Sequence, residues 1–113
     1  MRIAQWDILD FCRNPQHVSP GFPSGYWPHE DLVGGKTEWA RTASAFHRDL
    51  KAMQEYVLDP STDLFVRIPH GDGQTVLRQA LVVADLNSYH RGQIIVISRA
   101  GESLWSRRLA DES

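Results

Sequence analysis

The stretch from residue 74 to residue 100 limits the possible folds of this chain more than any other part of it. Its sequence, QTVLRQALVVADLNSYHRGQIIVISRA, contains no proline. Positions spaced by four and three residues fall on one side of an α-helix, and five of the seven at that spacing are aliphatic. These positions are Val76, Ala80, Val83, Asn87, His90, Ile94 and Ile97. The sequence therefore predicts a long helix over residues 73–100, about 40 Å in length.

A second side of the same helix is also apolar. It carries Leu77, Leu81, Ala84, Ser88 and Ile95. A helix that is apolar on two sides is usually central in a bundle or lies at an interface. We therefore expect a homodimer whose interface includes this second side, with the N-terminal helix alongside. On the first side, Asn87 and His90 need polar partners, because an unpaired buried polar group is costly.

The run from Ile94 to Ile97 leaves an alternative open. All four of its residues are β-branched, and residues 100–103 could turn, so residues 93–105 alone would also suit a β-hairpin. The unbroken helical spacing from Val76 to Ile97 favours the helix.

Two further helices are expected. Residues 1–13 form the first, with Leu9 at the margin of an apolar side made by Ala4, Ile8, Phe11 and Cys12. Residues 37–58 form the second, with Thr37 as N-cap and Asp49 on the solvent side. Its apolar side comprises Trp39, Ala43, Phe46, Leu50, Met53 and Val57. A connector over residues 59–72 follows, in which Asp72 could cap the long helix, and residues 101–113 read as a polar tail.

The segment from residue 14 to residue 36 is a long loop, rich in proline and glycine. Its aromatic residues Phe22, Tyr26 and Trp27 indicate that it is packed and ordered, because disordered segments are poor in aromatics. It could be a lid over a site or a packed connector, and long ordered loops favour the connector.

Length, composition and charge limit the classes of protein to which the chain can belong. The chain has 113 residues, enough for one domain, and is 42% hydrophobic and 23% charged, as ordinary globular proteins are. The formal net charge of -2 and the lack of a basic cluster argue against nucleic-acid binding. No apolar run reaches membrane-spanning length, and Asp7 and Asp10 interrupt any signal-peptide pattern. We expect a cytoplasmic protein with no membrane partner. The single cysteine, Cys12, excludes an internal disulfide.

The spacing of the histidines gives no metal site. His17, His29, His47, His70 and His90 include no pair at metal-ligand spacing, and there is no Cys-x-x-Cys. His90 alone lies in an apolar stripe. A core histidine with a hydrogen-bonded neighbour is the favoured interpretation, because metal ligands come in clusters.

The segment GDGQTVLRQALVVADLNSYHRGQIIVISRA is similar to the last-helix signature of the DinB/YfiT-like superfamily, GDGxTxLREALxxADHNxYHxGQxxxLRR. Two earlier segments also resemble parts of that family: its second helix is similar to RIAQWDILDFCRNP, and the loop after that helix is similar to VSPGFPSGYWP. The resemblance implies an all-α, antiparallel four-helix bundle that is often dimeric. It also implies a divalent metal, such as zinc or nickel, on three histidines. Some relatives are thiol-dependent transferases or isomerases.

The chain does not retain all of the residues that carry function in that family. Only the last ligand is present, as His90, and Leu86 stands where the ligand four residues earlier would be. The first ligand would fall just before Met1, so we expect a bundle that lacks its first helix, either because the true start lies upstream or because the form is shortened. Arg78 is retained from an arginine–glutamate pair, but its partner is Gln79.

These departures predict a DinB-like domain of three long helices that acts as a metal-free or weakly metal-binding scaffold. We expect no resident cofactor and identify no catalytic residue. The candidate residues for lining a small-molecule pocket are Leu86, Asn87, Gln79, Trp27 and Tyr26. His90 is the candidate remnant metal ligand. The alternative is a metal-dependent transferase or hydrolase of the thiol-dependent type, in which His90 acts with ligands such as His47 or an acidic residue.

Overall fold

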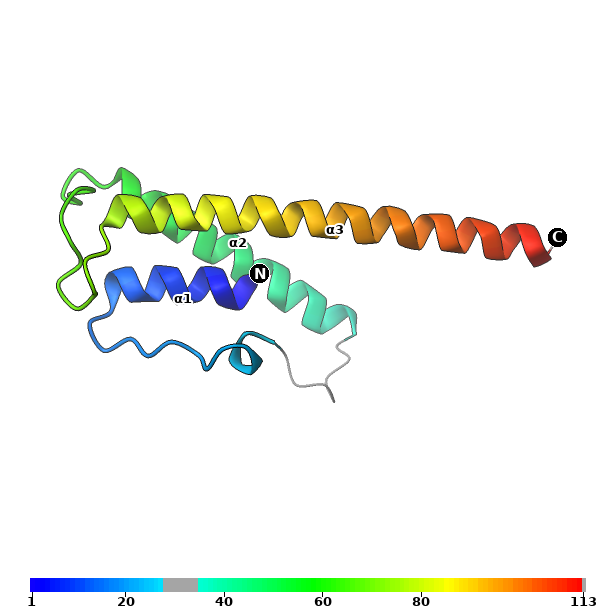
Figure 1. Cartoon of the computed structure of the whole chain (residues 1–113), viewed down its shortest axis with the longest axis horizontal. Coiled ribbons are helices and arrows are strands. Elements are labelled where there is room, and N and C mark those ends of the chain that lie inside the picture. The colour runs from blue at the N-terminus through cyan, green and yellow to red at the C-terminus, as the bar shows by residue number, and fades with distance from the viewer. Residues whose placement is uncertain (28–34, 113) are drawn as a thin grey trace.

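The computed structural model describes residues 1–27 and 35–112, and these residues form an all-α structure (Figure 1). Helix α1 spans Arg2–Arg13, the short 3-10 helix η1 spans Ser24–Tyr26, α2 spans Lys36–Leu58 and α3 spans Val76–Glu112. The described residues contain no β-strand, and the connector between α2 and α3 makes one isolated antiparallel bridge, Arg67 with Thr75. The predicted fold class is therefore confirmed, with three long helices.

The helices do not follow a simple antiparallel order. In Figure 1, α1 and α2 point the same way along the long axis, and α3 runs opposite to both. The segment between α1 and α2 is long enough to carry the chain back along α1, so α2 can begin at the end where α1 begins. The expected antiparallel arrangement thus holds for α3 against its neighbours and is wrong for α1 against α2.

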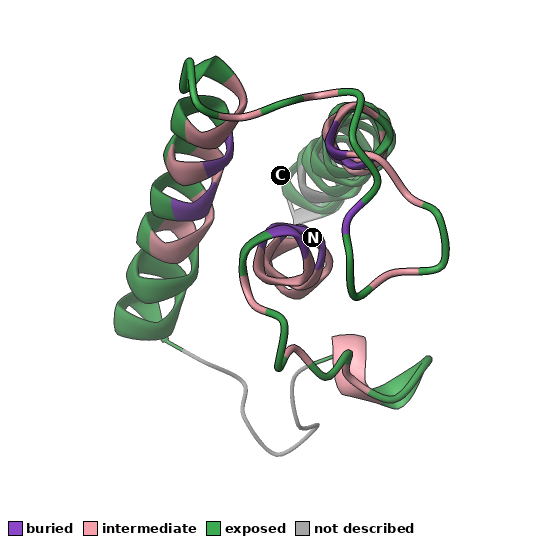
Figure 2. Ribbon diagram, turned by 90° about the vertical axis from the view of Figure 1, so that its left-hand side faces the viewer, coloured by how far each residue is buried: buried purple, intermediate pink, exposed green. Residues whose placement is uncertain are grey.

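The core lies where the three helices meet, and α1 packs against both of the others (Figure 2). Leu9 is only 1% exposed and is the most buried of the large side chains, so its predicted place at the margin of α1 is wrong. It lies inward because α1 has helices on two sides, which widens its buried face. The buried apolar residues are Ile8, Leu9, Cys12, Met53, Ile68, Val76 and Val83.

Helix α2 contributes less apolar surface to the core than its spacing predicts. The first turns of α2 are exposed along their whole length, and Trp39, which lies in them, is 73% exposed. Met53, further along the helix, is buried. Asp49, predicted to face solvent, is only 6% exposed, which is a second correction. The helix begins at Lys36 after Gly35, one residue before the predicted cap Thr37.

Helix α3 begins and ends differently from the prediction. The hydroxyl of Thr75 accepts a hydrogen bond from the backbone N–H of Arg78, so Thr75 caps the helix and Asp72 does not. The helix continues through Gly101 to Glu112, which makes the predicted tail wrong over residues 101–112 and excludes the hairpin alternative. Residues 102–112 contain no proline and several good helix formers, so nothing stops the helix at the glycine.

The two halves of α3 differ in their surroundings. Val76, Val83 and Asn87 face α1 and α2, as the first apolar side predicts. From residue 91 to residue 111 every described side chain is exposed, including Ile94 and Ile97, which were predicted to be buried with the rest of that side. The other helices do not reach this exposed half of α3, which projects beyond them (Figure 1). No described helix combines the length and apolar character that crossing a membrane requires.

Candidate functional site

His90 lies on α3 at the boundary between its packed half and its exposed half. The ring is partly buried, and Nδ1 is buried without a hydrogen-bond partner among the described residues. Burial lowers the pKa of His90, and the positive charge of the chain's N-terminus lowers it further, while the backbone carbonyl of Leu86 partly opposes them. The ring is therefore neutral at pH 7, and one nitrogen keeps a free lone pair.

The residues around His90 do not fit the three-histidine metal site that the resemblance implies. Leu86, one turn earlier, is half-buried and packs against the hydrophobic core. Within residues 1–27 and 35–112 no three His, Cys, Asp or Glu side chains are grouped in a way that could hold a metal ion. One neutral imidazole beside an aliphatic side chain is a poor donor set for zinc or nickel.

The predicted pocket-lining residues are dispersed and do not surround one cavity. Gln79 is buried and its Oε1 accepts a hydrogen bond of 2.8 Å from Nη1 of Arg78, so a charged guanidinium meets a neutral amide and no ion pair forms. Tyr26 lies on η1 and binds α1, whereas Trp27 is exposed. Asn87 hydrogen-bonds Gln5 of α1, and Leu86 packs against the hydrophobic core. Of the five, Asn87 alone lines the groove between α2 and α3.

That groove runs between α2 and α3 and has a volume of about 390 Å³. Its walls are almost wholly apolar because most of the side chains that line it are aliphatic. The lining residues are Leu50, Met53, Gln54, Val57, Leu58, Ala80, Val83, Ala84 and Asn87. The groove offers an apolar surface with few polar groups and no ionisable side chain, which suits binding and does not suit acid–base chemistry.

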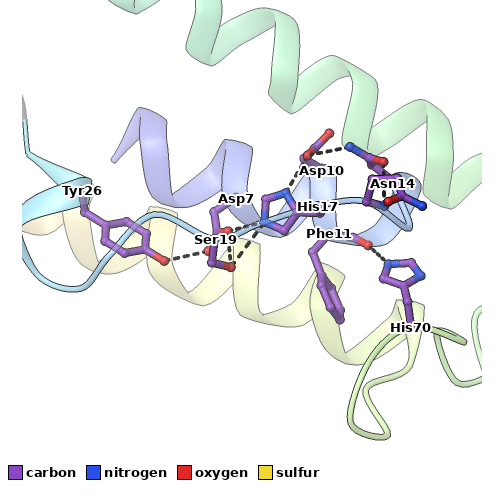
Figure 3. Close-up of polar contacts among 9 residues, drawn as sticks. Asp7, Asp10, Phe11, Asn14, His17, Ser19, Tyr26 and His70 are labelled. Atoms are coloured by element: carbon purple, nitrogen blue, oxygen red, sulfur yellow. Dashed lines mark hydrogen bonds and ion pairs between the residues drawn. The ribbon is translucent and has the colours of Figure 1, made fainter.

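The densest polar cluster lies elsewhere, between α1 and the segment that follows it (Figure 3). His17 has its ring held between two carboxylates of α1: Nδ1 is 2.6 Å from Asp10 Oδ2 and Nε2 is 2.6 Å from Asp7 Oδ1. The hydroxyls of Ser19 and Tyr26 also donate to Asp7, at 2.8 and 2.9 Å. The cluster ties His17, Ser19 and Tyr26 to α1, but Phe22 and Trp27, which were expected to pack, are 88% and 73% exposed, so that part of the expectation is wrong.

The charge state of this cluster follows from its geometry. Burial lowers the pKa of His17, but hydrogen bonds to Asp10 and Asp7 and their negative charges outweigh it and raise the pKa above its usual value. Only the imidazolium carries an N–H on both nitrogens, and only that form can donate to both carboxylates. The ring also makes edge contacts with Trp6 and Phe11. Because the His17 side chain is 2% exposed, the cluster is a structural clamp and leaves no room for a substrate.

Sequence reasoning missed this clamp. Asp7 and Asp10 are three residues apart on one helix and so share a face, which was the available signal. Their partner His17 lies in a proline-rich loop whose path the sequence does not define. Of the other histidines, His70 hydrogen-bonds the Phe11 carbonyl, His47 is exposed on α2, and His29 lies outside the described residues.

No protein family, curated protein or solved structure matches the chain.

Proposed function

We propose that this protein is an assembly scaffold of the DinB-like type, a helical protein that acts by presenting apolar helix faces to a partner. The observation that supports it is the exposed half of α3. There Ile94, Ile97 and Leu104 continue, with unbroken spacing, the apolar side that Val76 and Val83 bury in the core. An apolar stripe that continues beyond its own core is typical of a helix that packs against a further element.

The proposal includes a site without resident metal. The support for this part is the position of Leu86, which packs against the core where the resemblance implies a second ligand. A cation at His90 would meet an aliphatic side chain there in place of an imidazole.

Titration with zinc and with nickel tests the proposal. Calorimetry on chelator-treated protein is expected to show no one-to-one binding tighter than roughly micromolar. The matched control is Leu86→His, which places two imidazoles four residues apart on the same side of α3 and is expected to bind zinc. If the control fails as well, the last helix does not place its residues as the resemblance implies.

The alternative function is a metal-dependent transferase or hydrolase with His90 as one ligand. It predicts one zinc or nickel ion per chain in protein purified without chelator, and loss of that ion in His90→Ala. Finding both by elemental analysis would overturn the scaffold proposal.

A further inference from the structure

We infer that the clamp around His17 is a proton-controlled switch: the imidazolium holds residues 14–27 against α1, and loss of its second N–H proton releases this segment locally while the three helices stay packed. Figure 3 shows the contacts that hold the segment. The switch is a conformational device of the single chain, so it does not rest on the proposed scaffold function.

Side chains, and not the backbone, attach the segment to α1. In the described part of the chain, every backbone–backbone hydrogen bond donated by residues 17–27 is accepted within residues 14–24. Phe22 and Trp27 are exposed, so they bury little apolar surface against α1. The attachment therefore depends on the hydrogen bonds that the segment makes to Asp7 and Asp10.

The segment is compact in itself, so it can move as a unit. The backbone N–H of Gly25 donates to the carbonyl of Gly21 at 2.6 Å, which closes a turn. A Cβ on Gly25 would lie 2.7 Å from Cβ of Pro20, so the chain passes very close to itself there. The rings of Phe22 and Tyr26 meet edge to face with their centroids 6.1 Å apart. None of these contacts depends on α1.

The clamp closes on one imidazole between two carboxylates. Nδ1 of His17 lies 2.6 Å from Oδ2 of Asp10, and Nε2 lies 2.6 Å from Oδ1 of Asp7. The side chain of His17 is buried, so water does not replace either partner in the closed state. The imidazolium presents an N–H to each carboxylate, which satisfies both ring nitrogens at once.

A neutral ring cannot make both contacts, because it carries a single N–H. If the proton leaves Nδ1, the lone pair of that nitrogen faces Asp10, whose other side-chain donor among the described residues is Asn14 at 3.4 Å. If the proton leaves Nε2, the lone pair faces Asp7. The hydroxyl of Ser19, 3.3 Å from Nε2, can donate to it only by giving up its own bond to Asp7.

Either neutral form of His17 therefore places a carboxylate oxygen 2.6 Å from a nitrogen lone pair inside the protein. Two acceptors at this distance repel each other, and the carboxylate loses a charged donor that no described group replaces. Release of the segment relieves the repulsion and gives the oxygen and the nitrogen access to water.

The groups around His17 give the direction of the response. Burial lowers its pKa, but hydrogen bonds to Asp10 and Asp7 and their negative charges raise the pKa by more. Tyr26 keeps its proton, because burial and the contact with Asp7 raise its pKa as well. His70 of the connector bonds a backbone carbonyl of α1 and not the ring of His17. Among the described residues, no charged group of α2 or α3 adds to the causes that shift the His17 pKa.

Deprotonation consequently favours the released form. In that form the imidazole of His17 is solvated and has an ordinary pKa of about 6.5, below that of the closed form. Between these two pKa values the ratio of released to closed chains rises by up to about tenfold per pH unit, and it is smallest below about pH 6.5. Release uncovers the ring edges of Trp6 and Phe11 that His17 contacts in the closed form.

NMR on the full chain tests the switch from about pH 6 to about pH 9, the range in which a histidine with a raised pKa titrates. The ring centroids of His17 and Trp6 are 5.4 Å apart, so the closed clamp gives a nuclear Overhauser effect between the two rings. This signal is expected to weaken as the His17 ring titrates. The side-chain amide signals of Gln5 and Asn87, which are hydrogen-bonded between α1 and α3, are expected to stay unchanged.

Asp10→Asn is the variant that separates a switch from a fixed contact. A side-chain amide can either donate to or accept from Nδ1, so a neutral His17 is satisfied by Asp7 and the new amide together, and the ring contact is expected to persist to about pH 9. Asp85→Asn, at an exposed position on α3, is the matched control and should respond as the natural chain does.

Three results would overturn the inference. The first is a contact between His17 and Trp6 that the natural chain retains to about pH 9. The second is a contact that disappears together with the Gln5 and Asn87 signals, because the whole fold would then be opening. The third is an unchanged pH response in Asp10→Asn.

Discussion

The side-chain amide of Asn87 donates a hydrogen bond of 2.9 Å to Oε1 of Gln5. The amide nitrogen of Gln5 in turn donates to the backbone carbonyl of Phe46, also at 2.9 Å. This relay joins all three helices through one residue of α1 that is 2% exposed. Each polar group in it is satisfied by another helix, so the relay specifies how the helices align as well as contributing to stability.

Gln5→Ala is expected to lower the free energy of unfolding by about 2 to 4 kcal/mol, because it leaves the Asn87 amide without its partner, removes a second hydrogen bond to the Phe46 carbonyl and opens a cavity. Urea denaturation measures this change. The double variant Gln5→Leu with Asn87→Leu is expected to recover most of the loss, since removing both side chains leaves fewer unpaired groups. If the single changes add in a double-mutant cycle, the relay does not couple the helices.

The pH dependence of stability is expected to carry the signature of His17. Its folded-state pKa is raised above the unfolded value, so its stabilising contribution is complete below about pH 6.5. That contribution is lost as the pH rises through the folded-state pKa. The difference in unfolding free energy between the natural chain and His17→Gln should therefore shrink as pH increases.

The natural chain and His17→Gln both contain His90, so the difference between their unfolding free energies removes its contribution. The lowered pKa of His90 destabilises the fold of both chains as the pH falls below about 6.5. His47→Gln is the control for replacing a histidine at an exposed position on α2. An NMR titration that placed the His17 pKa below that of a free histidine would contradict the clamp.

The thiol of Cys12 is expected to react slowly. Burial raises its pKa to about 11, while the charge of Arg13 lowers it in part. At pH 8 the thiolate fraction is about a thousandth, so modification by a disulfide reagent should be at least about a hundredfold slower than at an exposed cysteine. Ser103→Cys in a Cys12→Ala chain provides that exposed reference. Equal rates would show that α1 opens readily from the core.

Two aliphatic truncations separate folding from assembly. Met53→Ala is expected to cost about 2 to 5 kcal/mol at every protein concentration, because Met53 is buried within a single chain. Ile97→Ala is expected to leave the stability of the single chain nearly unchanged, because Ile97 is 69% exposed. Thermal melts of both variants at low and high concentration measure the difference. An equal cost for Ile97→Ala at both concentrations would mean that one chain buries it alone.

The sequence predicts the helices well because their periodicity is local. The stripe from Val76 to Asn87 meets the core as expected, and Asn87 finds the polar partner that it needs. The prediction failed at Ile94 and Ile97, where the same periodicity continues without a neighbouring helix. Periodicity identifies a face, and only the positions of other elements decide whether that face is covered.

The polar contacts were less predictable for a related reason. The charge of Asp49 predicts that it faces solvent, and its burial follows from the packing of α2 in the folded chain. His17 is unremarkable in the sequence, and its partners Asp7 and Asp10 become visible only when the loop folds back on α1. At His90 the prediction rests on the resemblance alone, through Leu86 at the position where a second histidine is implied, and such a comparison of residues needs no knowledge of the fold.

The projection of α3 beyond the core has a consequence for the exchange of its backbone amides with solvent. Most helical stability in proteins comes from tertiary packing, which the part of α3 after residue 91 lacks, and Gly92 and Gly101 weaken this part further. The amides after residue 91 are therefore expected to exchange with solvent faster than those between Val76 and Asn87, and a partner that covers this part is expected to slow the exchange.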